Sequence, residues 1–257
     1  MAVSAHRAPE VIRPGSLREL VESFGDGADT VVLGGGTVLV PDLAHRHVRP
    51  RRVLLLPPEL SGVSRADGNV TIGAATRVSE LEAADEPLAT AARHLADREV
   101  RAQATVGGNL CVRGGETPRG DLQAPLLVLG ARVRTAGPGG ERSMPLEDFL
   151  ASGPNGRVVL DVAYDDAPRQ TGYAAVLRPH THHYTILAVA AARRDGETRV
   201  AVTGAAPTAV RLPSVEAGGS PEDALNDVDP PDDALASAWY RSRVLPTLVG
   251  RALSSLQ

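Results

Sequence analysis

Two glycine-rich turns, one near residue 35 and one near residue 107, constrain this chain more than any other feature. The first follows a short apolar run in Val31-Val-Leu-Gly-Gly-Gly-Thr-Val-Leu39, and the second is Thr105-Val-Gly-Gly-Asn109. Glycines directly after a strand leave backbone amides open to an anion, because no Cβ shields them and positive φ angles are allowed. Thr37, Thr105 and Asn109 add hydrogen-bonding side chains to the two turns.

Neither turn is decisive by itself. The first has no Gly-Lys-Ser/Thr sequence and no GxGxxG spacing, so an ordinary turn after a strand stays open as an alternative. Asp121 can accept a hydrogen bond from a ribose hydroxyl, or it can cap a helix N-terminus. Two such turns in separate units nevertheless make sense if one long ligand lies between the units and each unit supplies amides.

The composition limits the class of protein. Apolar residues make up 42% of the 257 residues, which is enough for a hydrophobic core. A mean hydropathy of -0.10, with no apolar run approaching ~20 residues, argues against a transmembrane helix. The net charge of -4 gives no basic field for nucleic acid, and the N-terminus has no apolar segment of a secretory signal. We therefore expect a cytoplasmic protein that binds neither nucleic acid nor membrane.

The single cysteine, Cys111, excludes an internal disulfide, a cysteine-built zinc site and an iron–sulfur cluster held by this chain alone. We expect Cys111 to be a small apolar filler next to the second turn rather than a reactive thiol. The segment His180-Thr-His-His183 can bind a metal or lie on a surface strand, and we expect no metal site there. Four arginines around the second turn can compensate an anionic ligand, dock an acidic partner or simply be solvated: Arg98, Arg101, Arg113 and Arg119.

The order of the predicted elements indicates three units. In the first, a capping box at Ser16 and Glu19 opens a helix to about Phe24, and strands follow at 31–33 and 52–56. In the second, we expect strands at 69–74 and 157–162, the latter an edge or final strand. Residues 78–84 and 88–96 carry helical spacing, and 105–110 reads as a strand-to-turn segment.

The third unit begins after the acidic stretch at 165–168. We expect a hairpin turning at Asp195-Gly196, a surface connection over 213–233 with at most one helical turn, and a helical segment over 235–256 that kinks or restarts at Pro246. Trp239, Tyr240 and Leu245 on this segment are candidates for a docking surface. Alternatively, Trp239 packs against the hairpin at 184–203.

Several stretches, taken in order along nearly the whole chain, resemble one protein family. They are Leu33–Leu39, Val70–Ala74, Glu99–Leu110, Asp121–Val133, Pro145–Leu150, Gly204–Arg211 and Tyr240–Leu253. The chain resembles the FAD-binding subunit of molybdenum hydroxylases, the family that includes the flavin subunits of xanthine dehydrogenase and carbon monoxide dehydrogenase. The Thr-Val-Gly-Gly-Asn segment within this series is the most specific part of the likeness.

The resemblance implies an α+β fold: a two-subdomain, PCMH-like FAD-binding domain over residues 1–165 (subdomains about 1–58 and 59–165), then a small α+β C-terminal domain over 166–257. FAD would lie extended between the two subdomains. By motif match, the cofactor-binding residues would be Leu33, Gly34, Gly35, Gly36, Thr37 and Leu39 at the pyrophosphate, Thr105, Gly107, Gly108 and Asn109 in a second cradle, and Asp121 at the ribityl or ribose hydroxyls.

The resemblance also implies an oxidoreductase that passes electrons from iron–sulfur and molybdopterin partner subunits through FAD to an external acceptor. Departures from the family pattern are Val38, Leu177 or Arg178 where a lysine is common, and the 111–120 insert. A standalone FAD-dependent oxidoreductase and a non-catalytic protein with a decayed flavin site therefore stay open as alternatives. No general acid/base pair stands out, so no catalytic residue is assigned.

Overall fold

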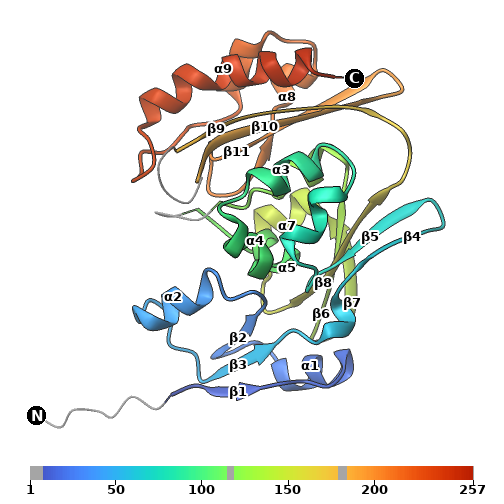
Figure 1. The fold of residues 1–257 in the computed structure, drawn as a ribbon, viewed down its shortest axis with the longest axis vertical. Helices are drawn as coiled ribbons and strands as arrows, with labels where there is room; N and C mark the ends of the chain where they lie inside the picture. The colour runs from blue at the N-terminus through green and yellow to red at the C-terminus, as the bar shows by residue number, and fades with distance from the viewer. Residues whose placement is uncertain (1–7, 115–118, 179–183, 257) are drawn as a thin grey trace, which may run out of the picture.

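Three sheets follow one another along the chain, from the N-terminal unit at the bottom of Figure 1 to the C-terminal unit at the top. The computed structural model describes residues 8–114, 119–178 and 184–256. Helices accompany each sheet, and the α+β class with a two-part N-terminal region and a smaller C-terminal unit confirms the predicted fold class. The domain limits at residues 58 and 165 stay a prediction.

The N-terminal sheet has three parallel strands in the order β1-β3-β2. Its elements are β1 (Glu10–Ile12), α1 (Leu17–Phe24), β2 (Thr30–Leu33), α2 (Leu39–Ala44) and β3 (Arg52–Leu55). Ser16 caps α1, because its Oγ accepts from the amide of Glu19 at 3.2 Å. The Glu19 carboxylate accepts from the amide of Gly15 rather than Ser16, so only half of the predicted capping box forms.

The middle sheet has five antiparallel strands in the order β4-β5-β8-β6-β7. Its strands are β4 (Val63–Ala66), β5 (Asn69–Gly73), β6 (Arg132–Gly137), β7 (Gly140–Pro145) and β8 (Val158–Asp165). The sequence predicts β8 as an edge or final strand. β8 is the last strand of this sheet along the chain, but it lies inside the sheet, because residues 158–162 are all buried and the strand pairs with β5 on one side and β6 on the other.

Short helices surround the middle sheet. They are η1 (Pro58–Leu60), η2 (Val78–Ala83), α3 (Leu88–His94), α4 (Arg98–Gln103), α5 (Val106–Leu110), α6 (Gln123–Val128) and α7 (Leu146–Ser152), with η marking a 3-10 helix. The prediction of a strand-to-turn segment at 105–110 is wrong, since Thr105 caps α5 through a bond from the amide of Gly108 to its Oγ1 at 3.3 Å. Asp121 caps no helix, because the N-cap of α6 is Leu122.

The C-terminal sheet has four antiparallel strands in the order β12-β11-β10-β9. They are β9 (Gln170–Leu177), β10 (Thr185–Arg194), β11 (Glu197–Thr203) and β12 (Val210–Arg211). The predicted hairpin turn is confirmed, since Asp195 and Gly196 both have positive φ, 51° and 84°. Between 213 and 233 lie two helical pieces rather than at most one turn, α8 (Pro213–Glu216) and η3 (Pro221–Asn226).

The last helix, α9 (Ala238–Ser254), crosses the C-terminal sheet (Figure 1). It runs through Pro246 as one element, so no restart occurs there. Leu245 is fully buried and cannot belong to a docking surface, whereas Trp239 is 73% exposed. The alternative in which Trp239 packs against the 184–203 hairpin is therefore wrong.

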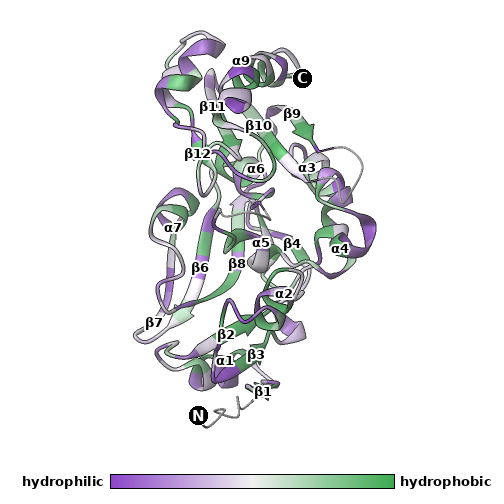
Figure 2. Ribbon diagram, turned by 90° about the vertical axis from the view of Figure 1, so that its left-hand side faces the viewer, coloured by the Kyte–Doolittle hydropathy of each residue, from purple (hydrophilic) through white to green (hydrophobic). Residues whose placement is uncertain are grey.

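Valine, leucine and alanine form most of the core, because only 3% of the residues are aromatic. Both phenylalanines, Phe24 and Phe149, are buried. Residues 185–192 of β10 are all buried, and most of this strand is coloured as hydrophobic in Figure 2. Within the described ranges, no helix is long and apolar enough to cross a membrane.

Candidate functional site

The two glycine turns open onto one cavity of about 430 Å³ between the N-terminal and middle sheets. Gly34, Gly35, Gly36, Thr37 and Leu39 line it from the first turn, and Thr105, Gly107 and Gly108 line it from the second. The structure thus brings eight of the eleven predicted cofactor-binding residues to one cavity. Leu33, Asn109 and Asp121 are not part of its wall.

The first turn presents a row of unbonded backbone amides. Among the described residues, the amides of Gly35, Gly36, Thr37 and Val38 and the hydroxyl of Thr37 have no hydrogen-bond partner. Gly36 has a φ of 74°, the left-handed conformation that glycine adopts without strain. Successive open amides form a concave donor surface that suits an anion such as a phosphate.

The two turns also touch each other. A Cβ on Gly34 would lie 2.2 Å from Thr105 Oγ1, and a Cβ on Gly35 would lie 1.9 Å from the carbonyl oxygen of Gln103. These two glycines are therefore required by the close approach of the first turn to the segment before α5, whatever ligand the cavity holds.

The second turn differs from the expectation of bare amides. The amide of Gly107 donates to Ala74 O at 2.9 Å, that of Gly108 donates to Thr105 Oγ1, and that of Asn109 donates to Thr105 O at 2.9 Å. The helix, its cap and Ala74 thus use the donors that a loop would leave free. What this turn offers the cavity is a wall without side chains at Gly107 and Gly108.

Asn109 and Asp121 lie behind this wall. Asn109 is buried, and its Oδ1 accepts from the amide of Leu122 at 2.9 Å. Asp121 is 6% exposed and its Oδ1 has no hydrogen-bond partner in the described part of the chain. Burial raises the pKa of Asp121 to about 6. An unpartnered buried carboxyl oxygen is costly, so it marks a place where a donor from a ligand would be stabilising.

The remaining predicted positions have mixed outcomes. Leu33 belongs to β2, where its carbonyl accepts from Leu56 at 3.1 Å. Cys111 is an exposed residue that lines the cavity, and desolvation of its thiol raises its pKa to about 11, which agrees with the expected filler rather than a reactive thiol. Leu177 lines a different, smaller cavity with Arg98 and Arg101. The segment 180–183 and most of the 115–120 part of the insert lie outside the described residues.

Three of the four arginines around the second turn have protein partners. Arg101 pairs with Glu82 at 2.8 Å, Arg113 donates to Leu150 O at 2.8 Å, and Arg119 pairs with Asp233. These contacts make all three structural rather than simply solvated. Within the described ranges, no group of three or more metal-binding side chains is present.

Sequence reasoning missed much of the cavity wall. The segment before β8 contributes Pro154, Gly156 and Arg157, β8 itself contributes Val159, and the N-terminal unit adds Phe24, Asp42 and Leu56. Arg157 donates to neutral acceptors, including Thr135 Oγ1 at 2.9 Å, and pairs with no carboxylate among the described residues. No local pattern could have identified these residues, because long-range packing of β8 against the N-terminal unit brings them there.

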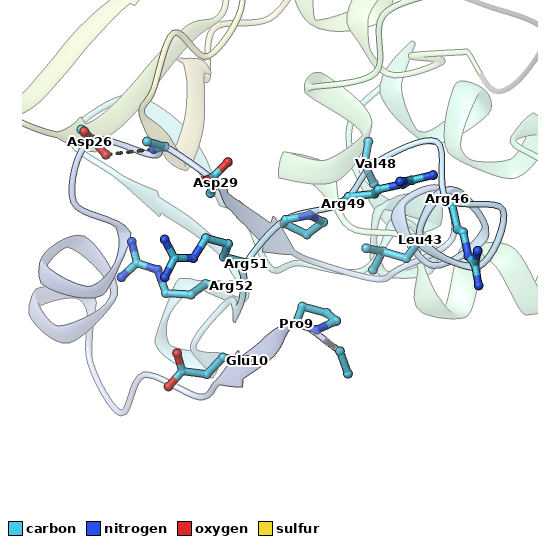
Figure 3. Close-up of a pocket in the computed structure, with 13 residues that line it drawn as sticks. Pro9, Glu10, Asp26, Asp29, Leu43, Arg46, Val48, Arg49, Arg51 and Arg52 are labelled. Atoms are coloured by element: carbon cyan, nitrogen blue, oxygen red, sulfur yellow. Dashed lines mark hydrogen bonds between the residues drawn. The ribbon is translucent and has the colours of Figure 1, made fainter. Parts of the chain in front are cut away.

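A second cavity, of about 1110 Å³, lies beside the N-terminal sheet and contains no residue of either glycine turn. Carboxylates and arginines both line it. In Figure 3, Arg51 and Arg52 lie on the side of Asp26 and Glu10, whereas Arg46 extends the opposite way. Because side chains of both charges line this cavity and its arginines point in different directions, the cavity favours neither an anionic nor a cationic ligand.

The fold and the first cavity define a dinucleotide-binding protein of the α+β class, with open amides for a diphosphate and a glycine wall opposite. Residues 5–162 match the family described as the FAD binding domain in molybdopterin dehydrogenase, and the chain belongs to that family. FAD is therefore confirmed as the cofactor. Backbone amides without partners are the donors that a pyrophosphate needs, so the first turn fits this part of FAD.

Known proteins align with this chain over almost its whole length. The medium chain of carbon monoxide dehydrogenase from Hydrogenophaga pseudoflava is 28% identical over 274 residues, covering 94% of both chains. The xanthine dehydrogenase FAD-binding subunit of Escherichia coli O157:H7 is also 28% identical, over 278 residues and 94% of both chains. The solved carbon monoxide dehydrogenase of H. pseudoflava superposes with a TM-score of 0.85 at 26% identity, covering 97% of both chains. The chain is thus an FAD-binding oxidoreductase subunit of the molybdenum hydroxylase family.

Proposed function

We propose that this subunit passes electrons from iron–sulfur and molybdopterin partner subunits, through its FAD, to an external acceptor. Bound FAD supplies the redox chemistry, and the protein supplies orientation and hydrogen bonds. The observation that carries the proposal is the row of open amides from Gly35 to Val38, which faces a cavity shared by two units. The relatives are named as subunits of dehydrogenases, which supports partners for this chain as well.

The proposed cofactor contacts divide between the two turns. Gly34, Gly35, Gly36, Thr37 and Leu39 would hold the pyrophosphate, with Leu33 fixing the turn to β3. Thr105, Gly107 and Gly108 would form the opposite wall, and Asn109 would fix that wall to α6. Asp121 would accept from a ribityl or ribose hydroxyl. The corresponding domains are 1–165 for FAD binding and 166–257 for the C-terminal domain.

The partners must supply the other redox centres under this proposal. One cysteine cannot hold a cysteine-ligated cluster. The chain's own residues bind the flavin, and the glycines of the turns keep side chains away from its diphosphate. No two described groups are arranged as an acid/base pair for chemistry on a separate substrate.

The test is purification of the chain from its native locus, followed by an absorption spectrum and cofactor extraction. We expect yellow protein that releases FAD and co-purifies with two other polypeptides. The isolated chain should reduce acceptors poorly with any small donor. Turnover of a small substrate by the lone chain with FAD would instead establish the standalone oxidoreductase, and a colourless protein that cannot be reconstituted would establish a decayed site.

A further inference from the structure

A fully buried glutamine joins the second glycine turn to the C-terminal unit. Gln123, at the start of α6, donates through Nε2 to Val112 O at 2.8 Å and Leu110 O at 3.2 Å, with a longer contact to Asn109 O at 3.4 Å. Its Oε1 accepts from the amide of Ala209 at 2.9 Å. Because carbonyls only accept and the amide only donates, one orientation of the side chain matches every partner, with its two N–H groups shared among the three carbonyls.

The two ends of this side chain contact different parts of the molecule. Leu110 ends α5, the short helix whose Gly107 and Gly108 form the cavity wall. Ala209 lies in the connection between β11 and β12, in the C-terminal sheet. A helix of five residues is marginal by itself, so its position depends on what holds its ends. Thr105 holds the first end of α5, and Gln123 holds the last.

Neighbouring contacts strengthen the same junction. The amide of Gly114 donates to Pro207 O at 2.5 Å, and Thr203 Oγ1 donates to Gly120 O at 3.4 Å. A Cβ on Gly120 would lie 2.2 Å from Nε2 of Gln123, so the absence of a side chain there leaves room for the amide. Gly114 and Gly120, which follow the second glycine turn, are therefore held by the connection between β11 and β12 and by the end of β11.

We propose that Gln123 is a positioning residue that couples the C-terminal unit to the FAD site, so that FAD binding and docking of the C-terminal unit stabilise each other. The inference rests on the proposed placement of FAD at the two glycine turns. Coupling of this kind is reciprocal: whatever free energy the docked unit adds to FAD binding, FAD adds to docking.

The first test replaces Gln123 with leucine, which keeps the approximate volume and removes both polar ends. FAD affinity is measured by equilibrium dialysis, and the stability of the FAD-free chain by urea unfolding followed by circular dichroism. We expect the dissociation constant of Q123L to rise about tenfold or more. The matched control is Ser214→Ala, which removes a 2.8 Å hydrogen bond to Asp227 within the C-terminal unit. It should lower stability and leave FAD affinity unchanged.

The second test needs no variant. Hydrogen exchange of the wild-type chain is compared with and without FAD at the amides of Ala209 and Gly114. We expect FAD to slow exchange at both, although neither residue lines the cavity, and we expect Q123L to lose this protection at Ala209. A purely structural glutamine would leave the slowing by FAD at Ala209 the same in Q123L as in the wild type.

The outcomes separate the two proposals. If the wild-type chain binds no FAD, the proposed function fails. If the wild type binds FAD but folded Q123L binds it equally well, the coupling is overturned. If Q123L does not fold, the wild-type exchange rates at Ala209 decide, and rates unaffected by FAD overturn the coupling.

Discussion

Glycine has two different roles at the two turns, and a single methyl group distinguishes them. At Gly35 an added Cβ would lie 1.9 Å from the backbone carbonyl oxygen of Gln103, so one of the two backbone segments would have to move. At Gly108 the nearest atom is Thr105 Oγ1 at 3.0 Å, and the position lies inside α5. Gly35 is therefore needed for the contact between the two units, whereas Gly108 is needed only to keep the adjoining part of the cavity free of a side chain.

The first prediction follows from this difference. Gly35→Ala should destabilise the FAD-free chain by about 1–3 kcal/mol through overpacking. Gly108→Ala should keep its stability, because alanine favours a helix by ~1 kcal/mol over glycine, and should weaken FAD binding by placing a methyl group in the cavity wall. Urea unfolding and equilibrium dialysis measure the two effects. Equal losses of stability in both variants would contradict the assignment.

The second prediction concerns the buried carboxyl of Asp121, whose pKa burial raises from 3.8 to about 6. The folded chain then binds this proton more tightly than the unfolded chain, so stability falls as the pH rises from about 4 through 6. Roughly two pKa units correspond to about 3 kcal/mol. Urea unfolding of the FAD-free chain at about pH 4.5 and pH 7 should show about 2 kcal/mol of this loss in the wild type and none of it in Asp121→Asn.

A control for this pH dependence lies nearby. Hydrogen bonds from Arg241 and from the backbone outweigh desolvation and lower the pKa of Asp233 to about 2, so its contribution disappears only as the pH falls below about 4. The window above pH ~4 therefore reports Asp121 rather than Asp233. Asp121→Asn should also weaken FAD binding, because the amide is a poorer acceptor than the carboxylate. A variant that keeps the pH dependence would place its origin elsewhere.

Among the elements, α9 is held to the rest of the molecule by a buried ion network. Arg241 of α9, fully buried, donates to Asp233 at 2.7 Å, and Asp233 also pairs with buried Arg119, just before α6. Nε of both arginines has no hydrogen-bond partner among the described residues, so the carboxylate of Asp233 carries most of the compensation.

The third prediction is that Asp233→Ala costs about 3–5 kcal/mol of unfolding free energy, because two buried guanidinium groups lose their counter-charge. Glu197→Ala is the matched control. Its pair with Arg199 at 3.2 Å is largely exposed, and such a pair contributes about 0–1 kcal/mol. Both values come from urea unfolding. A loss below about 1 kcal/mol for Asp233→Ala would mean that the arginines find other partners.

Elements with a local signal could be predicted from the sequence. The residues Asp195 and Gly196 readily adopt the positive φ angles of a hairpin turn, and α1 has an N-cap at Ser16 and a C-cap at Gly25. Helix α5 could not be predicted, because Val-Gly-Gly-Asn is a poor helix former. It forms because Thr105 caps it and because the amides of Val106 and Gly107 bond to Thr76 and Ala74 in the middle unit.

The candidate site shows the same division. The glycine turns and Asp121 can be recognised in the sequence from their residue types and spacing. The wall residues Pro154, Arg157 and Val159 cannot, since they reach the cavity only because β8 occupies the centre of its sheet. Likewise, the central place of β8 depends on pairing with β5, far earlier in the chain.

For the whole molecule, the proposed FAD site lies between two units, so FAD bound there would help to hold them together. The fourth prediction is that one FAD binds per chain without a covalent bond and stabilises the fold. At a free concentration 100 times the dissociation constant, FAD should add about 2.7 kcal/mol. Thermal unfolding with increasing FAD measures this, and acid or heat should release all the flavin. Flavin that stays with the denatured chain would contradict non-covalent binding.

The exposed indole of Trp239 has a practical consequence. It is the chain's single tryptophan, it lies in the first turn of α9, and 73% of its surface is open to water. Its fluorescence should already resemble that of an indole in solvent, so the emission wavelength will hardly change when the chain unfolds, and an emission-based melt would miss the transition. The same property makes it a background-free optical label for assembly. A blue shift on mixing with another polypeptide would report that the N-terminal end of α9 has been covered, without any dye attached to the protein.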